Sequence, residues 1–208
     1  MAVFGLFAME AIESVIFDWG GVLIDDPRAG LLRYCAHAFG VSQDDYTPVH
    51  DSFLDEFHTG AISEQMFWHR ISAELGKPAP ETRSLWYEAF RAAYVPRSEV
   101  FSLATSLHDK GYKTALLSNT ELPAVGFFHE QNYNMLDVLV FSCVEGIAKP
   151  EREIYDITLN RLGSKAQQTV FTDDRPDYIQ GAREAGLNAI LFESTDQLKS
   201  ELTQLAVG

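Results

Sequence analysis

The hydrophobic pattern divides the chain into a short strand, a purely helical stretch and a long alternating segment. Val15-Ile16-Phe17 is an apolar run that ends at Asp18 and a Gly20-Gly21 pair, which is typical of a buried strand stopping at a tight loop. From Pro27 to about Val95 strand signals are absent, and apolar and aromatic residues recur at helical spacing. The first strand is therefore followed by a helical insertion.

Four helices are predicted in this insertion. Gly40, Gly60 and the segment 76–80 separate them, and Ser63 is a plausible N-cap for the third. The predicted helices carry many aromatic side chains, which we interpret mainly as packing between helices, with some available to line a pocket: Phe53, Phe57, Phe67, Trp68, Trp86, Tyr87, Phe90 and Tyr94. His50, His58 and His69 lack a metal-binding spacing and are interpreted as surface or pocket polar groups.

After Pro96 helices and strands alternate. The pattern predicts helices over 98–110, 123–131, 151–162, 176–185 and 196–205, and strands over 113–117, 138–141, 169–172 and 188–192. The sequence thus predicts the α/β class, with a doubly wound parallel sheet as the core (1–25 and 97–208) and an inserted small helical-bundle cap (26–96). In such sheets ligands bind at the carboxyl ends of the strands, beside a switch in strand order.

Composition and charge restrict the classes of binding partner that can be expected. The chain has 208 residues, 46% of them hydrophobic, and its 16 basic against 30 acidic residues give a formal charge of −14. Nucleic acid and anionic membrane surfaces need a basic footprint, so neither is expected as the main partner. A site for a phosphorylated molecule would have to be positive locally, and its cations must be identifiable.

The cysteines and the first residues suggest a location. Cys35 and Cys143 are the only cysteines and are interpreted as buried thiols in a reducing compartment. The apolar Met1–Met9 stretch has no basic start and no clear cleavage site, and we interpret it as a short leader. We expect a cytoplasmic protein that is monomeric or weakly homo-oligomeric.

Polar residues follow four of the predicted strands. Asp18 ends the first, Ser118-Asn119-Thr120 ends the second, Lys149-Pro150 lies after the third, and Asp173-Asp174 ends the fourth. Each group alone has an ordinary structural explanation, such as a turn or a helix cap. Independent accidents would not all fall on one edge of one sheet, so the four together predict a functional site.

The chemistry of the set is that of phosphoryl transfer. A carboxylate such as Asp18 can attack phosphorus and form an acyl phosphate that water then hydrolyses. Mg²⁺ prefers one or two carboxylates with other oxygens, which Asp18, one of Asp173 and Asp174, and the Gly20 carbonyl would supply. Lys149 would neutralise the remaining charge, and the Ser118 hydroxyl with backbone N–H groups would hold phosphate oxygens. The predicted phosphate-binding residues are Ser118, Asn119, Lys149 and Gly20, and the cation and Lys149 would also make the site positive.

Four motifs in order resemble the haloacid dehalogenase-like hydrolases. They are Val15-Ile16-Phe17-Asp18-Trp19-Gly20-Gly21-Val22-Leu23, Ala115-Leu116-Leu117-Ser118-Asn119-Thr120, Lys149-Pro150 with Ile154-Tyr155, and Val170-Phe171-Thr172-Asp173-Asp174-Arg175-Pro176-Asp177-Tyr178-Ile179. With the elements between them they cover nearly the whole chain. The resemblance is closest to bacterial sugar-phosphate phosphatases, of the α-D-glucose-1-phosphate phosphatase type, with a Phe-Asp-x-Gly-x-Val start.

The resemblance implies a Rossmann-like core, a small cap and a role for each residue. Asp18 would be the nucleophile, Ser118 the phosphate-binding hydroxyl, and Lys149 the cation that orients both. Asp174 would be the direct metal ligand, with Asp173 close by. The implied activity is Mg²⁺-dependent hydrolysis of a small phosphorylated metabolite, with a sugar phosphate as one candidate.

One position departs from the family pattern. Most of the phosphatases carry a second aspartate two residues after the nucleophile as general acid and base, and here that position is Gly20. General acid–base help is typically worth ~10²–10⁴-fold. Asp25 or Asp26 could substitute, although both could equally cap the first cap helix.

Two other functions fit parts of the pattern. A haloacid dehalogenase shares the nucleophile but needs no metal, and an acidic pair without a bridging cation would repel its carboxylate substrate. A binding or regulatory protein with a degraded site would account for the missing acid. The presence of Asp18, Ser118, Lys149 and the acidic pair favours the Mg²⁺-dependent phosphohydrolase.

Overall fold

The computed structural model describes residues 11–208. The predicted leader, Met1–Met9, lies outside the described residues. Strands and helices follow one another in the order β1 (Ser14–Phe17), α1 (Arg28–Phe39), α2 (Gln43–His58), α3 (Glu64–Leu75), α4 (Leu85–Ala93), α5 (Ser98–Asp109), β2 (Lys113–Ser118), α6 (Leu122–Glu130), β3 (Val138–Phe141), α7 (Ser142–Glu145), α8 (Arg152–Leu162), a 3-10 turn (Ala166–Gln168), β4 (Thr169–Asp173), α9 (Pro176–Glu184), β5 (Asn188–Leu191) and α10 (Thr195–Gln204).

The described strands form one parallel sheet in the order β3-β2-β1-β4-β5. Strand order reverses beside β1, because β2 and β3 lie on one side of it and β4 and β5 on the other. The predicted α/β class and doubly wound parallel sheet are confirmed, and every predicted strand is present within a residue or so of its expected bounds. Asp18 therefore follows the central strand, at the switch point where ligands bind in such folds.

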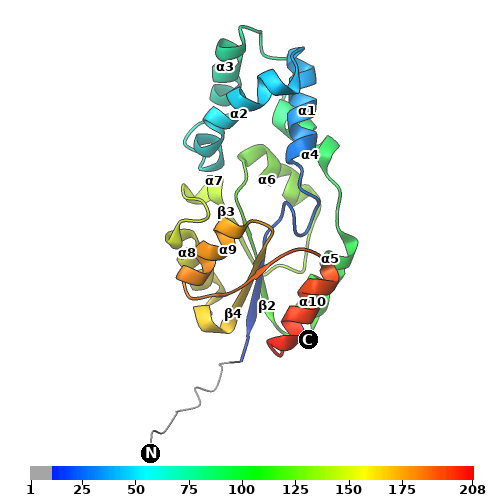
Figure 1. Cartoon of the computed structure of the whole chain (residues 1–208), viewed down its shortest axis with the longest axis vertical. Coiled ribbons are helices and arrows are strands. Elements are labelled where there is room, and N and C mark those ends of the chain that lie inside the picture. The colour runs from blue at the N-terminus through cyan, green and yellow to red at the C-terminus, as the bar shows by residue number, and fades with distance from the viewer. Residues whose placement is uncertain (1–10) are drawn as a thin grey trace, which may run out of the picture.

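Helices cover both faces of the sheet (Figure 1). Side chains alternate along β1, so that Val15 and Phe17 pack in the cluster with α5, α6 and α10, whereas Ile16 packs with α8 and α9. All strands thus have apolar residues on both faces, as a sheet buried on both sides requires. The rigid sheet fixes the positions of the residues that end its strands.

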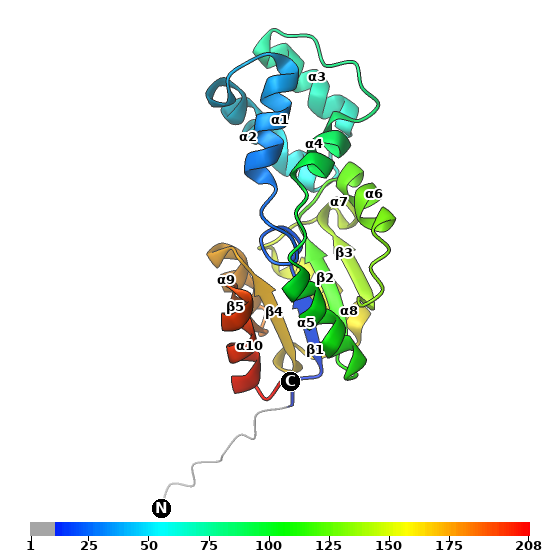
Figure 2. The same ribbon diagram turned by 90° about the vertical axis from the view of Figure 1, so that its right-hand side faces the viewer.

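The helices α1–α4 lie beyond the carboxyl edge of the sheet, away from the N-terminal end of the described chain (Figure 2). We call them the cap helices. Their starts and stops follow local sequence: the predicted N-cap Ser63 accepts a hydrogen bond from the Met66 amide, and Gly40 ends α1 with a positive φ of 64°. The predicted domain limits at 25/26 and 96/97 stay a prediction.

Aromatic side chains form the interior of the cap helices, as predicted. Phe57 stacks on Phe67 with ring centroids 4.5 Å apart, and Trp86 meets both rings edge-on. Only Trp86 and Phe90 of the eight aromatic residues named above also line the cavity at the sheet edge. Cys35 and Cys143 are buried free thiols, as expected.

Two paired linkers join the cap helices to the sheet domain. The Asp25 amide donates to the Val95 carbonyl at 2.9 Å, and the Arg97 amide donates to the Leu23 carbonyl at 2.9 Å. Arg97 also binds the Asp25 carboxylate at 2.8 Å and the Gly21 carbonyl at 2.8 Å. The entry and exit of the cap helices therefore lie side by side. Among residues 11–208 no helix is long and apolar enough to cross a membrane.

Candidate active site

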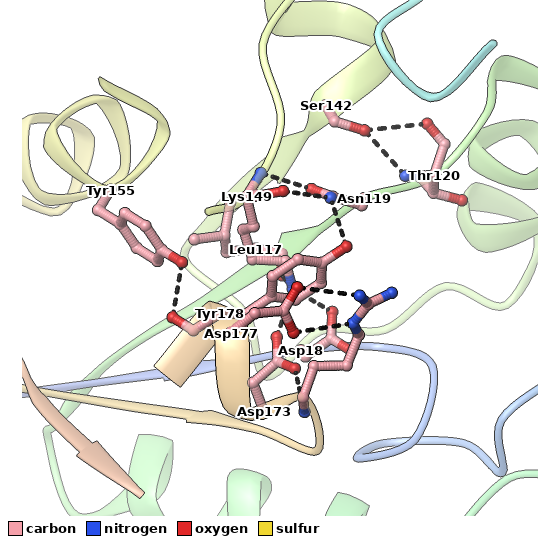
Figure 3. A network of polar contacts seen from close by, with 11 residues as sticks. Asp18, Leu117, Asn119, Thr120, Ser142, Lys149, Tyr155, Asp173, Asp177 and Tyr178 are labelled. Carbon is pink, nitrogen blue, oxygen red and sulfur yellow. Dashed lines mark hydrogen bonds and ion pairs between the residues drawn. The ribbon is translucent and has the colours of Figure 1, made fainter. Parts of the chain in front are cut away.

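The four predicted strand ends meet around Asp18. Its amide donates to the Thr172 carbonyl at 3.0 Å, which places the residue between β1 and β4, and the residue is only 7% exposed. Figure 3 shows Asp18, Lys149 and Asp173 converging from different segments of the chain. The predicted edge of polar residues is thus a single cluster in the structure.

Lys149 joins the two buried carboxylates of the cluster. Its Nζ lies 2.7 Å from Asp18 Oδ1 and 2.6 Å from Asp173 Oδ2, and it also donates to the Leu117 carbonyl at 3.0 Å. Burial opposes the charge of Lys149, but the carboxylates of Asp173 and Asp18 outweigh it and raise the pKa of the ammonium group. Lys149 is thus a fixed cation against Asp18.

Asp173 and Asp174 differ in what their oxygens do. Asp173 has no exposed surface, and its carboxylate accepts from Lys149 Nζ and from the Arg175 amide at 2.9 Å. The half-buried Asp174 carboxylate makes no side-chain hydrogen bond or ion pair within residues 11–208 and lines the cavity. Asp174 is therefore available to a ligand, whereas Asp173 holds Lys149.

The donor set fits a hard divalent cation. Carboxylate oxygens of Asp18, Asp173 and Asp174 lie within 4.8 Å of one another. Burial raises the pKa of Asp18 to about 7, with Asp173 adding to the shift and Lys149 opposing it. After burial, the neighbouring carboxylates of Asp173 and Asp26 raise the pKa of Asp174. Crowded carboxylates of this kind are stabilised by a bound cation, and all their ligand atoms are oxygens, as Mg²⁺ requires.

Ser118 and Asn119 occupy different positions relative to the cavity. Ser118 is buried at the end of β2 and lines the cavity, and its hydroxyl has no hydrogen-bond partner in the described part of the chain. The Asn119 side chain donates to the Lys149 carbonyl at 2.9 Å and accepts from the Lys149 amide at 2.9 Å. It therefore fixes the backbone of Lys149, and the predicted binding of phosphate at Asn119 stays a prediction.

A cavity of about 210 Å³ lies beside the cluster and is lined by Asp18 and Lys149. Its lining residues from the sheet edge include Asp18, Gly20, Ser118, Asn119, Lys149 and Asp174, and those from the cap side include Arg28, Leu31, His50, Leu54, His58, Trp86 and Phe90. The cavity thus has a charged end at the sheet and a mixed wall on the cap helices, with Leu31, Leu54, Trp86 and Phe90 apolar or aromatic and Arg28, His50 and His58 polar.

Asp25 and Asp26, the two acids considered as substitutes for the missing aspartate, differ in whether they line the cavity. Asp25 is paired with Arg97 in the linkers and does not line the cavity. Asp26 lines it, and its Oδ1 accepts from the Arg28 amide at 2.9 Å in the first turn of α1. Two features of the site are not indicated by the sequence pattern. They are the contact between His58 and Glu121 and the close approach of Gly21 to the Asp174 carboxylate.

Replacing Gly21 by alanine should weaken metal binding. Gly21 has a φ of 93°, and a Cβ atom there would overlap the Asp174 carboxylate. We expect Gly21→Ala to displace Asp174 and to lower Mg²⁺ affinity by ~10–100-fold, the usual effect of disturbing the support of a metal ligand. Isothermal titration of the purified protein with Mg²⁺ measures it.

Gly40→Ala is the matched control, because Gly40 also has a positive φ, of 64°, but no atom lies within 4 Å of the added Cβ. Its Mg²⁺ affinity should equal that of the wild type. Equal affinities for Gly21→Ala and the wild type would show that Asp174 does not bind the metal.

Comparisons with known proteins agree with this geometry. A family model described as haloacid dehalogenase-like hydrolase matches residues 12–186. The chain is 25% identical to the sesquiterpene phosphatase astK of Aspergillus oryzae, over 93% of this chain and 96% of that protein.

Two solved structures have the same fold. A HAD-like family hydrolase from Porphyromonas gingivalis is 25% identical with a TM-score of 0.78, over 97% of this chain and 100% of that chain. The HAD family enzyme BT-2542 of Bacteroides thetaiotaomicron, solved with magnesium and inorganic phosphate, is 22% identical with a TM-score of 0.70, over 88% and 95%. Because the family model spans most of the chain and its motif residues meet at one site, the protein belongs to the haloacid dehalogenase-like hydrolases.

Proposed function

We propose that the protein is a Mg²⁺-dependent phosphohydrolase that removes phosphate from a small phosphorylated metabolite through an aspartyl-phosphate intermediate. The observation that carries this proposal is the buried Asp18–Lys149–Asp173 cluster beside the free Asp174 carboxylate. A fixed cation against a buried carboxylate, with a second carboxylate open to a metal, suits attack on an anionic phosphoryl group.

The chain's own residues divide the reaction between them. Asp18 attacks phosphorus, and its position is fixed because Lys149 Nζ holds one of its oxygens at 2.7 Å. The three N–H donors of Lys149 are taken by Asp18, Leu117 and Asp173, so this residue supplies positive charge beside the phosphoryl group, and the Ser118 hydroxyl binds a phosphate oxygen at the end of β2. Asn119 keeps Lys149 in place through its backbone.

Asp18, Asp174 and the Gly20 carbonyl would hold Mg²⁺. When bound, Mg²⁺ supplies positive charge that offsets the repulsion between the carboxylates and the phosphoryl group. The magnesium and phosphate recorded in BT-2542, which has the same fold, support the proposal.

The volume and the lining residues of the cavity restrict the size and polarity of the substrate. A space of about 210 Å³ beneath the cap helices suits a small molecule, and its wall of Leu31, Leu54, Trp86 and Phe90 suits an apolar portion beside the phosphate. A sugar phosphate, the candidate drawn from the sequence, would place hydroxyls near these apolar residues and near the polar Arg28, His50 and His58. The similar protein from Aspergillus oryzae is a sesquiterpene phosphatase, so prenyl-type phosphates are a second candidate class of substrate.

Hydrolysis of an aryl phosphate with and without Mg²⁺ tests the proposed function. We expect release of phosphate from p-nitrophenyl phosphate that requires Mg²⁺ and stops on chelation with EDTA. Release of chloride from a 2-haloacid without metal would instead identify a dehalogenase. Absence of both activities would favour a binding or regulatory protein.

Restoring an acid at position 20 should extend the range of substrates. A Cβ on Gly20 would lie 3.2 Å from Pro27 Cδ, so a side chain fits after a shift of a few tenths of an ångström. We expect Gly20→Asp to raise kcat/KM for alkyl phosphates about tenfold, below the full range of general acid catalysis because the loop must adjust. Gly20→Asn, which has the same shape but no acidic proton, should show no gain; equal gains for both variants would contradict the prediction.

A further inference from the structure

The proposed site leaves the departing oxygen of the substrate without a proton donor at the position where the family pattern places one. An alkoxide is a poor leaving group unless it is protonated as the bond to phosphorus breaks. Asp18 attacks from the sheet, so the leaving group departs toward the cap helices. A donor must therefore lie on the cap side of the same cavity.

His58 lies there and is attached to the phosphate-binding loop. It is the last residue of α2, and it lines the cavity together with Asp18, Ser118 and Lys149. Ser142 Oγ donates to the His58 carbonyl at 2.6 Å and accepts from the Thr120 amide at 2.9 Å. One serine thus fixes His58 relative to the loop that follows Ser118.

Tight packing supports the same attachment. A Cβ on Gly60, two residues after His58, would overlap the Cys143 carbonyl. The end of α2 therefore lies directly against α7, and His58 cannot move away from the sheet edge without breaking this contact.

Glu121 orients the imidazole. His58 Nε2 lies 2.8 Å from Glu121 Oε1, and the other carboxylate oxygen accepts from Trp86 Nε1 at 2.8 Å. The Glu121 side chain is only 5% exposed, whereas that of His58 is 22% exposed. His58 Nδ1 has no partner among residues 11–208, so this nitrogen is available to give or take a proton.

The other candidates in the cavity are less suited. His50 contacts Asp51 through Nδ1 at 2.9 Å, and burial lowers its pKa, which leaves the imidazole uncharged. Asp26 lies near Asp174, on the side of the proposed metal, and holds the Arg28 amide. His58, unlike these two residues, also lines a second cavity together with Asn119 and Lys149.

We propose that His58, positioned by Glu121, is the general acid and base of this site and replaces the aspartate that is absent at Gly20. The assignment rests on the proposed phosphohydrolase function. Among the described residues it makes the cap helices contributors to the chemistry as well as to the pocket wall.

Hydrolysis of a phosphate monoester would take two steps, transfer of the phosphoryl group to Asp18 and its release to water. A bond forms between a carboxylate oxygen of Asp18 and phosphorus, and the bond from phosphorus to the leaving oxygen breaks. That oxygen takes the proton from His58 Nδ1 and departs as an alcohol. Water then attacks phosphorus and gives its proton to the neutral His58, and inorganic phosphate and the Asp18 carboxylate are released.

The dependence on the leaving group tests the assignment. Values of kcat/KM are measured with saturating Mg²⁺ for p-nitrophenyl, phenyl and alkyl phosphates in the wild type, His58→Ala and His58→Gln. We expect a loss of ~10²–10⁴-fold for alkyl phosphates and less than about tenfold for p-nitrophenyl phosphate, whose leaving group needs no proton. Glu121→Gln should show a smaller loss with the same dependence on the leaving group.

Two further variants make the result decisive. His69→Ala, at an exposed position on α3 outside the cavity, should match the wild type on all three esters. Gly20→Asp in the His58→Ala background should raise kcat/KM for alkyl phosphates by at least the gain of about tenfold expected for this substitution in the wild type. Thermal unfolding of each variant checks that the fold is retained.

Equal losses on all three esters in both His58 variants would overturn the assignment, because a purely structural role affects every substrate alike. A dependence on the leaving group in His50→Ala but not in His58→Ala would overturn it as well. A wild type without Mg²⁺-dependent hydrolysis of any ester would overturn the proposed function itself, which separates the two failures.

Discussion

Asp18→Asn should abolish phosphate release, with kcat/KM reduced on the order of 10⁴-fold or more, as expected when the nucleophile itself is removed. The amide has the shape of the carboxylate but cannot form an acyl phosphate. The substitution would also leave Lys149 paired with Asp173 at 2.6 Å, so the cluster keeps one ion pair. Release of inorganic phosphate from p-nitrophenyl phosphate measures the effect.

The same variant should fold as well as the wild type. Burial raises the pKa of Asp18 to about 7, which means that the fold disfavours its charge, and a neutral amide escapes this cost. Urea denaturation should therefore show no loss of stability in Asp18→Asn. Substantial turnover in a folded Asp18→Asn protein would exclude the aspartyl-phosphate mechanism.

Lys149→Met should destabilise the protein as well as inactivate it. The Lys149 side chain is fully buried between Asp18 and Asp173, and its removal leaves two buried carboxylates without a cation. Breaking a buried pair by removing one partner costs about 3–5 kcal/mol. Urea denaturation without Mg²⁺ should show this loss, and phosphatase activity should be absent.

Two variants control for the change of size and charge. Lys199→Met, at an exposed position on α10, should leave stability nearly unchanged. Lys149→Met combined with Asp18→Asn and Asp173→Asn should regain most of the lost stability, because no unpaired buried charge remains. A Lys149→Met protein as stable as the wild type would show that the carboxylates do not depend on this lysine.

The fold is predictable from the sequence because each strand carries its own local signal. The apolar run 15–17 and the turn residues after it identify β1, and the regular alternation after Pro96 identifies the other strands. The four-residue helix α7 is not predicted, since one turn is too short to show a period. Tertiary contacts, not local sequence, determine that turn.

The catalytic cluster is predictable in its members but not in its contacts. Parallel strands bring their carboxyl ends to one edge, which is enough to gather Asp18, Ser118, Lys149 and the acidic pair. The sequence does not show that Asp173 binds Lys149 and Arg175 through its oxygens while Asp174 stays free. That difference depends on backbone angles after β4.

The contact between His58 and Glu121 is not predictable from the sequence. The two residues are far apart along the chain and meet where the end of α2 packs against α7 and, through Ser142, against the segment that follows β2. A histidine near the end of a helix and a glutamate near the start of one are both common, because each charge complements the helix dipole. The one available signal is the glycine at position 20, which indicates that an acid is needed but not where it lies.

The paired linkers carry an evolutionary consequence. Because the Asp25 amide binds the Val95 carbonyl and the Arg97 amide binds the Leu23 carbonyl, the sheet domain meets the insertion as a closed loop whose ends already touch. Lengthening or exchanging such a loop costs the rest of the chain little conformational entropy. Different cap helices can therefore be inserted into an unchanged sheet. Each insertion would bring a different substrate pocket and a different proton donor, while Asp18 and Lys149 keep their positions.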